Sequence, residues 1–291
     1  MKMMKKLMAL LLALAMVLAL AACSGGGDNN SQPPRGESDN PGNSESSEAP
    51  SDESTGEPAQ GGAEVTTVDS GKLHMATNAQ FPPYEMTTDN GGYEGIDVEI
   101  ATAIAAKLGL ELVVDDMDFK TVITAVQQGI SDMAMAGLTV DPEREKNVDF
   151  TVSYATGVQV IIVKNDSDIA SVDDLGGKLI GVQEGTTGWM YCSDDYGDDA
   201  VVAYDNGSAA VQALLSGSVD CVVIDNEPAK SYVAANAGLK ILDTEYVIED
   251  YAIGVSKDNP ALRDAINAAL EELIADGIVK DIIDKYIPPE G

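Results

Sequence analysis

The chain has 291 residues and a formal net charge of −32 at pH 7. A charge of this sign and size argues against nucleic acid as a partner. Its three cysteines and its single histidine, His74, form no spaced Cys/His cluster, so neither a metal nor a cofactor is expected.

The N-terminus has the pattern of a secretory signal peptide, predicted over residues 1–22. Lysines precede an apolar run over residues 7–22, which is shorter than the roughly 20 residues that a membrane-spanning helix needs. The string Leu20-Ala21-Ala22-Cys23 resembles the lipobox of bacterial lipoproteins. That resemblance implies cleavage before Cys23 and fatty acyl chains, such as palmitate, on the new terminus. An ordinary signal peptide with a chance cysteine is the alternative.

Residues 23–70 are predicted to form a lipidated cysteine followed by a disordered, acidic tether. This stretch is rich in Ser, Gly, Asn, Pro, Asp and Glu and has hardly an aliphatic side chain before Val65. Such a composition cannot bury enough apolar surface to offset the entropy of ordering. We therefore expect a protein that is tethered to the outer face of a bacterial membrane.

The remaining 220 or so residues alternate between strand and helix patterns, which is typical of an α/β fold with parallel sheets. The predicted strands are 72–77, 111–115, 132–136, 179–183, 201–204 and 220–224. The predicted helices are 96–108, 121–128, a helix from 187, 208–216, 227–236 and 260–276. Ligands of such folds lie beyond the carboxyl ends of the strands.

Polar motifs stand at those strand ends. They are Ala76–Glu85, Gly95–Ala101, Ala136–Arg144, Val148–Thr151, Gly181–Thr187 and Asp220–Asp225. In this order and spacing the chain resembles the polar amino acid-binding proteins of ABC importers, the family 3 extracellular solute-binding proteins. The resemblance implies a two-lobed periplasmic-binding-protein fold of type II, in which each lobe is a mainly parallel sheet flanked by helices and two strands form a hinge. Lobe 1 would span 71–156, lobe 2 157–248, and residues 249–291 would return to lobe 1.

The same resemblance implies a site for an amino acid zwitterion. Arg144 would bind the carboxylate with its planar guanidinium. Thr139 and Thr187 would add backbone N–H groups, and Asp225 would bind the ammonium. The Gly137 carbonyl would be a further acceptor, with Ala136 and Leu138 beside it in the motif.

Phe81 and Phe119 are expected to be aromatic walls of the cleft. Asn78 and Gln183 are expected to face the ligand side chain from opposite sides. Because neither is charged, a neutral polar amino acid is favoured. Glu85, Glu184 and Trp189 would change that preference if they faced the cleft, although Trp189 fits the core of a lobe equally well.

The function expected from the resemblance is binding of an amino acid outside the cytoplasm by a monomer, and its delivery to an ABC permease when the cleft closes. An enzyme on the same fold, of the dehydratase type, and a component that presents its ligand to a sensor are the alternatives. Cys192 and Cys221 could form a disulfide, but a buried free thiol is favoured for Cys221 because it lies in a strand-like run.

Overall fold

Two β-sheets organise the chain, which the computed structural model describes over residues 65–243 and 245–289. The first sheet has the strand order β5-β1-β6-β14-β7. Its strands are β1 (Lys72–Thr77), β5 (Glu111–Asp116), β6 (Met133–Ala134), β7 (Val148–Phe150) and β14 (Gly254–Ser256). β1 runs parallel to β5 and β6, whereas β14 lies antiparallel between β6 and β7.

The second sheet has the order β10-β9-β11-β8-β12, and β13 also pairs with β8. Its strands are β8 (Ala155–Lys164), β9 (Ile180–Gln183), β10 (Val201–Tyr204), β11 (Cys221–Asp225), β12 (Leu239–Ile241) and β13 (Val247–Tyr251). β9 runs parallel to β10 and β11, and β8 runs antiparallel to its partners. A small antiparallel sheet joins β2 (Gln80–Phe81), β3 (Glu85–Thr87) and β4 (Tyr93–Glu94).

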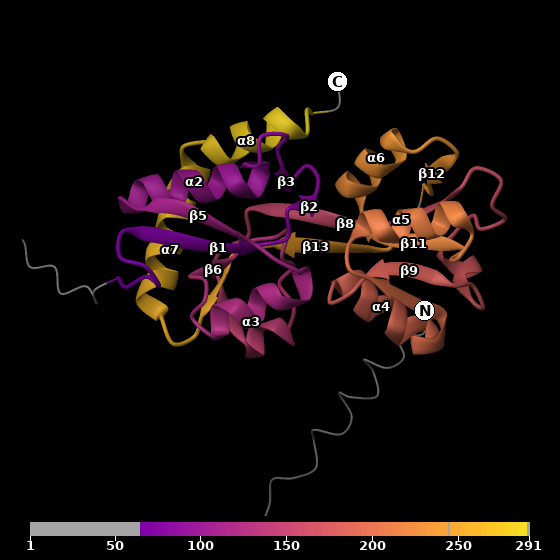
Figure 1. Cartoon of the computed structure of the whole chain (residues 1–291), viewed down its shortest axis with the longest axis horizontal. Helices are drawn as coiled ribbons and strands as arrows, with labels where there is room; N and C mark the ends of the chain where they lie inside the picture. Colours follow the sequence, from indigo (N-terminus) through magenta and orange to yellow (C-terminus); the bar gives the residue numbers. More distant parts are fainter. Residues whose placement is uncertain (1–64, 244, 290–291) are drawn as a thin grey trace, which may run out of the picture. The chain divides into compact units, whose positions relative to one another are not determined.

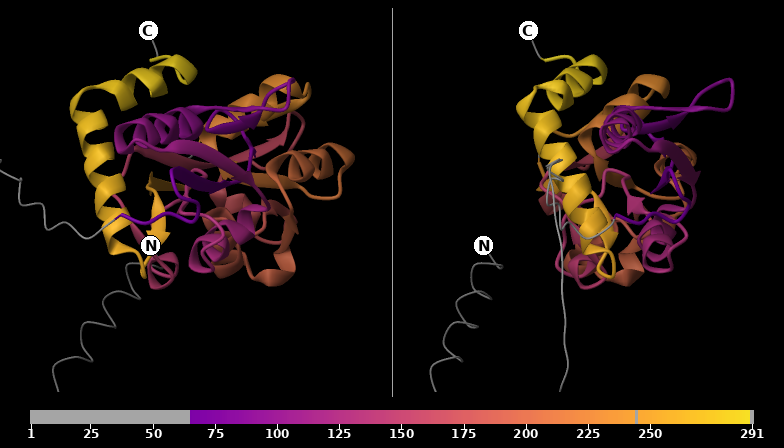
Figure 2. Two further views of the ribbon diagram at one scale, coloured as in Figure 1. Left: turned by 60° about the vertical axis from the view of Figure 1, so that its left-hand side comes forward. Right: turned by 90° about the vertical axis from the view of Figure 1, so that its left-hand side faces the viewer.

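Helices flank both large sheets (Figure 1). Beside the first sheet lie α2 (Ile96–Leu108), α3 (Val122–Gln127), α7 (Pro260–Ala275) and α8 (Ile278–Tyr286). Beside the second lie α4 (Thr187–Tyr196), α5 (Gly207–Ser216) and α6 (Asn226–Ala235). Figure 2 shows the C-terminal helices, in yellow, packed along the part of the chain that contains α2.

The strands β8 and β13 carry the chain between the two sheets. Residues Val247–Tyr251 of β13 pair with Gln159–Ala155 of β8 in antiparallel register. Just before β8 the Tyr154 N–H donates to the Tyr251 carbonyl at 2.9 Å, which ties the two crossings together. The predicted lobe boundaries, after residues 156 and 248, fall within these two strands, and the division into lobes stays a prediction.

Most predicted elements are present, and their ends follow simple chemistry. The predicted helix over 96–108 is α2, whose buried residues Ile96, Ile100 and Ile104 recur at helical spacing and which Gly109 ends in the left-handed conformation. The predicted strand over 132–136 is shorter, because only Met133–Ala134 pair before the chain turns toward the pocket described below.

The predicted signal peptide, Cys23 and the tether up to residue 64 lie outside the described residues. Within the described ranges, no helix has the length and apolar character needed to cross a bilayer.

Candidate ligand-binding site

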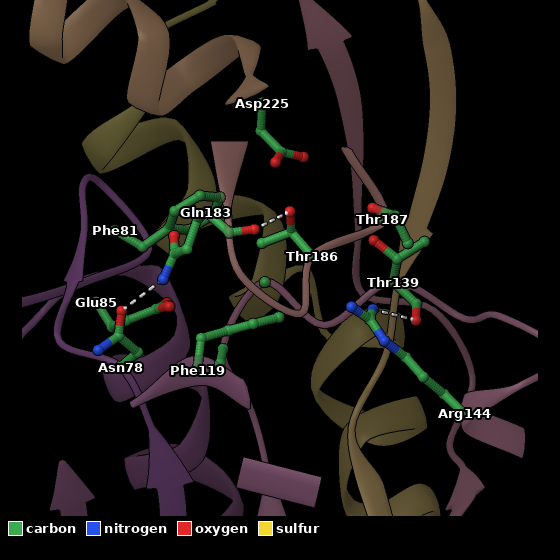
Figure 3. A pocket seen from close by; sticks show the side chains of 12 residues that line it. Asn78, Phe81, Glu85, Phe119, Thr139, Arg144, Gln183, Thr186, Thr187 and Asp225 are labelled. Carbon is green, nitrogen blue, oxygen red and sulfur yellow. Dashed lines mark hydrogen bonds between the residues drawn. The ribbon is translucent and has the colours of Figure 1, made fainter. Parts of the chain in front are cut away.

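A pocket lies between the two large sheets, and the motifs at the strand ends converge on it (Figure 3). The part of the chain that builds the first sheet contributes Asn78, Phe81, Glu85, Phe119, Ala136, Gly137, Thr139 and Arg144. The part that builds the second contributes Gln183, Thr186, Thr187 and Asp225. The structure therefore brings together every predicted ligand-binding residue except Leu138.

Arg144 provides a buried cation at one side of this pocket. Only 7% of the residue is exposed, and its guanidinium lies over the Phe119 ring, 5.5 Å from the centroid. It donates to two carbonyls, from Nη1 to Thr139 at 2.9 Å and from Nη2 to Gly185 at 3.1 Å. Burial lowers its pKa, but a guanidinium stays charged at neutral pH. No carboxylate lies within 4 Å of it in the described part of the chain.

Two backbone N–H groups lie close to this cation. Thr139 faces Tyr251 in an isolated antiparallel bridge. The two residues do not hydrogen-bond to each other, because the bonds of this bridge are made by the residues on either side of them. The N–H and C=O of Thr139 therefore point away from β13, on the side where its carbonyl meets Arg144. Thr187 is the first residue of α4, so its N–H has no partner within the helix. A helix N-terminus and a guanidinium together form a site for a carboxylate.

Asp225 provides a buried anion in the same pocket. It ends β11, is 7% exposed, and accepts hydrogen bonds from Gln159 Nε2 at 2.9 Å and from the Tyr251 hydroxyl. Burial, with the nearby Glu249 carboxylate, raises its pKa to about 7. No lysine or arginine pairs with it among the described residues. A carboxylate in this setting can accept an ammonium group.

Gln159 and Glu249 complete the network behind Asp225, although neither lies in a motif that the sequence analysis selected. The second hydrogen of Gln159 Nε2 is donated to Glu249 Oε2 at 2.9 Å. Both residues lie on the crossing strands, β8 and β13, and both are buried. A group that binds Asp225 is therefore connected, through the hydrogen bond between Asp225 and Gln159, to the strands that join the two sheets.

The pocket wall depends on a glycine. Gly137 has a left-handed φ of 53°, and a Cβ at this position would lie 2.8 Å from the Phe81 ring. Its N–H donates to Asp97 Oδ2 at 2.8 Å, and the same oxygen accepts from the Tyr154 hydroxyl at 2.8 Å. Asp97 thus fixes the backbone beside Phe81 to the first crossing of the chain.

Asn78 follows the end of β1 and Gln183 ends β9, and the two side chains contact each other across the pocket. Gln183 Nε2 donates to Asn78 Oδ1 at 3.0 Å and to the Asp205 carbonyl at 3.2 Å. Asn78 Nδ2 donates to the Met117 carbonyl at 2.9 Å. Much of the hydrogen-bonding capacity of both amides is thus used within the protein, and they do not decide the ligand by themselves.

The family follows from comparison with known proteins. The family model of the bacterial extracellular solute-binding proteins, family 3, matches residues 73–289. This chain belongs to that family. The arginine-binding extracellular protein ArtP of Bacillus subtilis (strain 168) is 34% identical over 229 residues, which are 75% of this chain and 87% of ArtP.

Solved structures confirm the type II periplasmic-binding-protein fold of this family 3 protein. An ancestral arginine-binding protein bound to glutamine is 41% identical with a TM-score of 0.71, over 75% of this chain and 98% of that one. The ancestral amino acid-binding protein AncCDT-1, a precursor of cyclohexadienyl dehydratase, is 30% identical with a TM-score of 0.68, over 74% of this chain and 95% of that one.

The structure places the other predicted residues of this family 3 protein away from the pocket. Leu138 is fully buried in a core cluster with Val122 and Val148. Trp189 packs against the core of the second sheet, and Glu184 forms an ion pair with Lys120 at 2.6 Å.

The histidine and the two described cysteines also lie outside the pocket. His74 contacts Asp69 and Asp115 through its two ring nitrogens. Cys192 and Cys221 are free and buried, and burial raises the pKa of each thiol to about 12.

Proposed function

We propose that this protein binds a free amino acid outside the cytoplasm and delivers it to the permease of an ABC importer. One observation carries the proposal: Arg144 and Asp225 are a buried cation and a buried anion that line the same pocket and have no oppositely charged partner in the described chain. A zwitterion is the ligand that would neutralise both. The free N–H groups near Arg144 add donors for its carboxylate.

Delivery would depend on closure of the cleft between the two lobes, proposed as 71–156 with 249–291 and as 157–248. Side-chain contacts already join the two parts. They are Gln183 with Asn78, Arg144 with the Gly185 carbonyl, Lys120 with Glu184 and the Tyr232 hydroxyl with the Gln80 carbonyl. A bound ligand would add its own contacts to both parts and so favour the closed form, which a permease can distinguish from the open one.

The proposal is tested by a thermal-shift screen of the purified protein against the twenty standard amino acids, citrulline and ornithine. A ligand that binds only the folded protein raises its melting temperature by mass action. We expect a rise with at least one α-amino acid, and no rise with the decarboxylated amine or the deaminated acid of the same ligand. A screen in which no amino acid raises the melting temperature would contradict the proposal.

Amino acid affinity should fall as the pH falls through about 7. Asp225 binds an ammonium only when ionised, and its raised pKa of about 7 in the ligand-free protein means that acid competes with the ligand. Affinity should be constant above that pH and decrease by up to about tenfold per pH unit below it. Titration calorimetry above and below pH 7 measures this change in affinity. An affinity that rises on acidification would rule out the binding of the ammonium group by Asp225.

We further propose that the protein is a monomer anchored by acyl chains on Cys23, and that it is not an enzyme. The sequence pattern before Cys23 supports the anchor. The pairing of Arg144 with the carboxylate and Asp225 with the ammonium supports retention of an intact amino acid, because both charged groups of the ligand remain bound. A dehydratase-like enzyme would instead convert a bound substrate, so incubation with the ligand and mass spectrometry of the recovered molecule distinguishes the two functions.

Replacing Cys23 by alanine should abolish the lipid anchor, since only a thiol can form the thioether. The variant should appear in the medium or as uncleaved precursor, whereas the parent should partition into the detergent phase of a membrane extract. Mass spectrometry of the parent's N-terminal peptide provides the direct check. If the parent itself is free in the medium and carries no acyl mass, the anchor is not formed.

A further inference from the structure

The two side chains that hydrogen-bond to Asp225 both come from the strands that join the two sheets. Gln159 of β8 donates from Nε2 to Asp225 Oδ2 at 2.9 Å, and the hydroxyl of Tyr251, at the end of β13, donates to Oδ1. Gln159 is 1% exposed and Tyr251 is fully buried. Both oxygens of this carboxylate are therefore oriented by the crossing strands, through side chains that do not line the pocket themselves.

Glu249 is a second buried acid that lies beside Asp225. Gln159 Nε2 also donates to Glu249 Oε2 at 2.9 Å, so this oxygen and Asp225 Oδ2 lie within about 6 Å of each other. Like charges at this separation repel, and the repulsion is strongest where little water screens it. No lysine or arginine forms an ion pair with Glu249 in the described part of the chain. The Gln159 amide is thus a donor that the two carboxylates share.

The Gln159 amide can bridge two carboxylates in only one orientation. Its NH2 group has two hydrogens to donate, whereas its oxygen can only accept and would be repelled by both acids. The oxygen is directed toward α4 instead, because a Cβ on Gly188, the second residue of that helix, would lie 2.9 Å from Gln159 Oε1. The first turn of a helix favours negative partial charge. Packing and electrostatics therefore both direct the donors of Gln159 to the two acids.

The charged and titratable groups around the two acids include one cation, Arg144, which acts on both but makes its own hydrogen bonds to carbonyls. The other groups that face this network are acids and phenols: Tyr191 on α4, Tyr84 and Glu85 at β3, Tyr251 on β13, Glu227 on α6, and Asp141. Burial first, and then the Glu249 charge, raise the pKa of Asp225 to about 7, while the hydrogen bonds from Tyr251 and Gln159 act in the opposite direction. These two bonds therefore help to keep Asp225 ionised near neutral pH.

We propose that Gln159 is a positioning residue of the binding site: by donating to Asp225 and Glu249 at once, it holds the Asp225 carboxylate in place and ionised for the ammonium group of the ligand. This inference rests on the proposed function, because it assumes that the ammonium binds at Asp225. Glu249 acts in the opposite sense, since its charge favours the protonated form of Asp225. The pH range over which the protein holds an amino acid is then set by two residues of the crossing strands.

Two substitutions with opposite expected effects test the proposal. Gln159→Met keeps the length of the side chain and removes both hydrogen bonds, so the pH below which affinity falls should rise by at least about one unit, with a loss of about tenfold at pH 7. Glu249→Gln removes the repulsion and keeps an acceptor for Gln159, so the same fall should move to lower pH by about one unit. Gln127→Met is the matched control, because Gln127 is exposed, donates to Asn147 and lies outside the pocket. It should leave the pH profile unchanged.

Titration calorimetry between pH 5 and pH 8.5 measures the profiles with L-arginine and L-glutamine, or with the amino acid that the thermal-shift screen selects if neither binds. The two probes have the same α-amino and α-carboxyl groups and differ in the charge of the side chain. Because Gln159 acts on the site for the α-ammonium, each substitution should shift the profile by the same amount with both probes.

A purely structural role for Gln159 gives a different result. In that case Gln159→Met would weaken binding by the same factor at every pH, and the proposal would be wrong. Shifts of the two profiles in the same direction would also overturn it. If Gln159→Met does not fold, Glu249→Gln decides alone, and a profile like that of the parent would count against the proposal. Failure of the proposed function looks different, because then no amino acid binds the parent at any pH.

Discussion

Replacing Arg144 by alanine should weaken amino acid binding by about 2–5 kcal/mol, and Asp225→Asn should have an effect of similar size. Each change leaves one pole of the zwitterion without a partner in a buried site, which is the costly way to break a charge pair. Titration calorimetry with the best ligand from the screen measures the loss. Lys146→Ala is the control, because the Lys146–Glu143 ion pair is exposed and outside the pocket.

The stability of the ligand-free variants shows whether Arg144 and Asp225 serve to bind the ligand or to stabilise the fold. Neither Arg144 nor Asp225 forms an ion pair within 4 Å in the described chain, so neutralising either one removes a buried charge that is compensated mainly by hydrogen bonds. The melting temperature without ligand should therefore stay the same or rise, while the shift caused by ligand disappears. Lower ligand-free stability with unchanged affinity would show that the residue serves the fold.

Replacing Gly95 by alanine should destabilise the folded protein by at least about 3 kcal/mol. Gly95 precedes α2 with a φ of 132°, and a Cβ there would lie 2.2 Å from the Tyr84 carbonyl oxygen. Backbone atoms cannot move aside as a flexible side chain can, so the turn between β4 and α2 would have to shift. Because Glu85 follows Tyr84 directly, the pocket would be affected as well.

Gly91→Ala is the matched control for that substitution. Gly91 also has a positive φ, 81°, but an added Cβ would meet nothing within 4 Å. Gly91→Ala should lower the free energy of unfolding by only about 1 kcal/mol, which is the cost of the backbone conformation alone. Urea denaturation of both variants gives the comparison. Equal losses would mean that the close approach to Tyr84 contributes nothing to the effect.

Helices and strands whose regularly spaced apolar residues face a single core could be predicted from the sequence. The helix over 96–108 is an example, since its apolar stripe and terminal glycine both point to the same bounds. The helix α8 was missed even though Gly277 and the spacing of Ile278 and Ile282 mark it, because the C-terminal prediction stopped at the end of α7. That signal was present in the sequence and could have been used.

The crossing strand β13 shows why part of the site could not be predicted. In this strand Glu249 is 5% exposed and Ile248 is 63% exposed, which inverts the usual rule that apolar residues face inward. The inner face here meets Gln159 and Asp225 in place of an apolar core, so hydropathy alone assigns the faces wrongly. Arg144 and Asp225 were found because their motifs resemble those of a known family, whereas Glu249 lies outside these motifs.

The place of β14 in the first sheet constrains the order in which a growing chain can fold. Strands β8 to β13 are continuous in sequence, so the second sheet can assemble as soon as residue 251 is available. The first sheet needs Gly254–Ser256 between β6 and β7, more than 100 residues after either strand. Until then the facing edges of β6 and β7 have no partner, and such long-range pairing is intrinsically slow. Translation must therefore be nearly finished before the first sheet can close, whereas the second sheet can already be complete at that point.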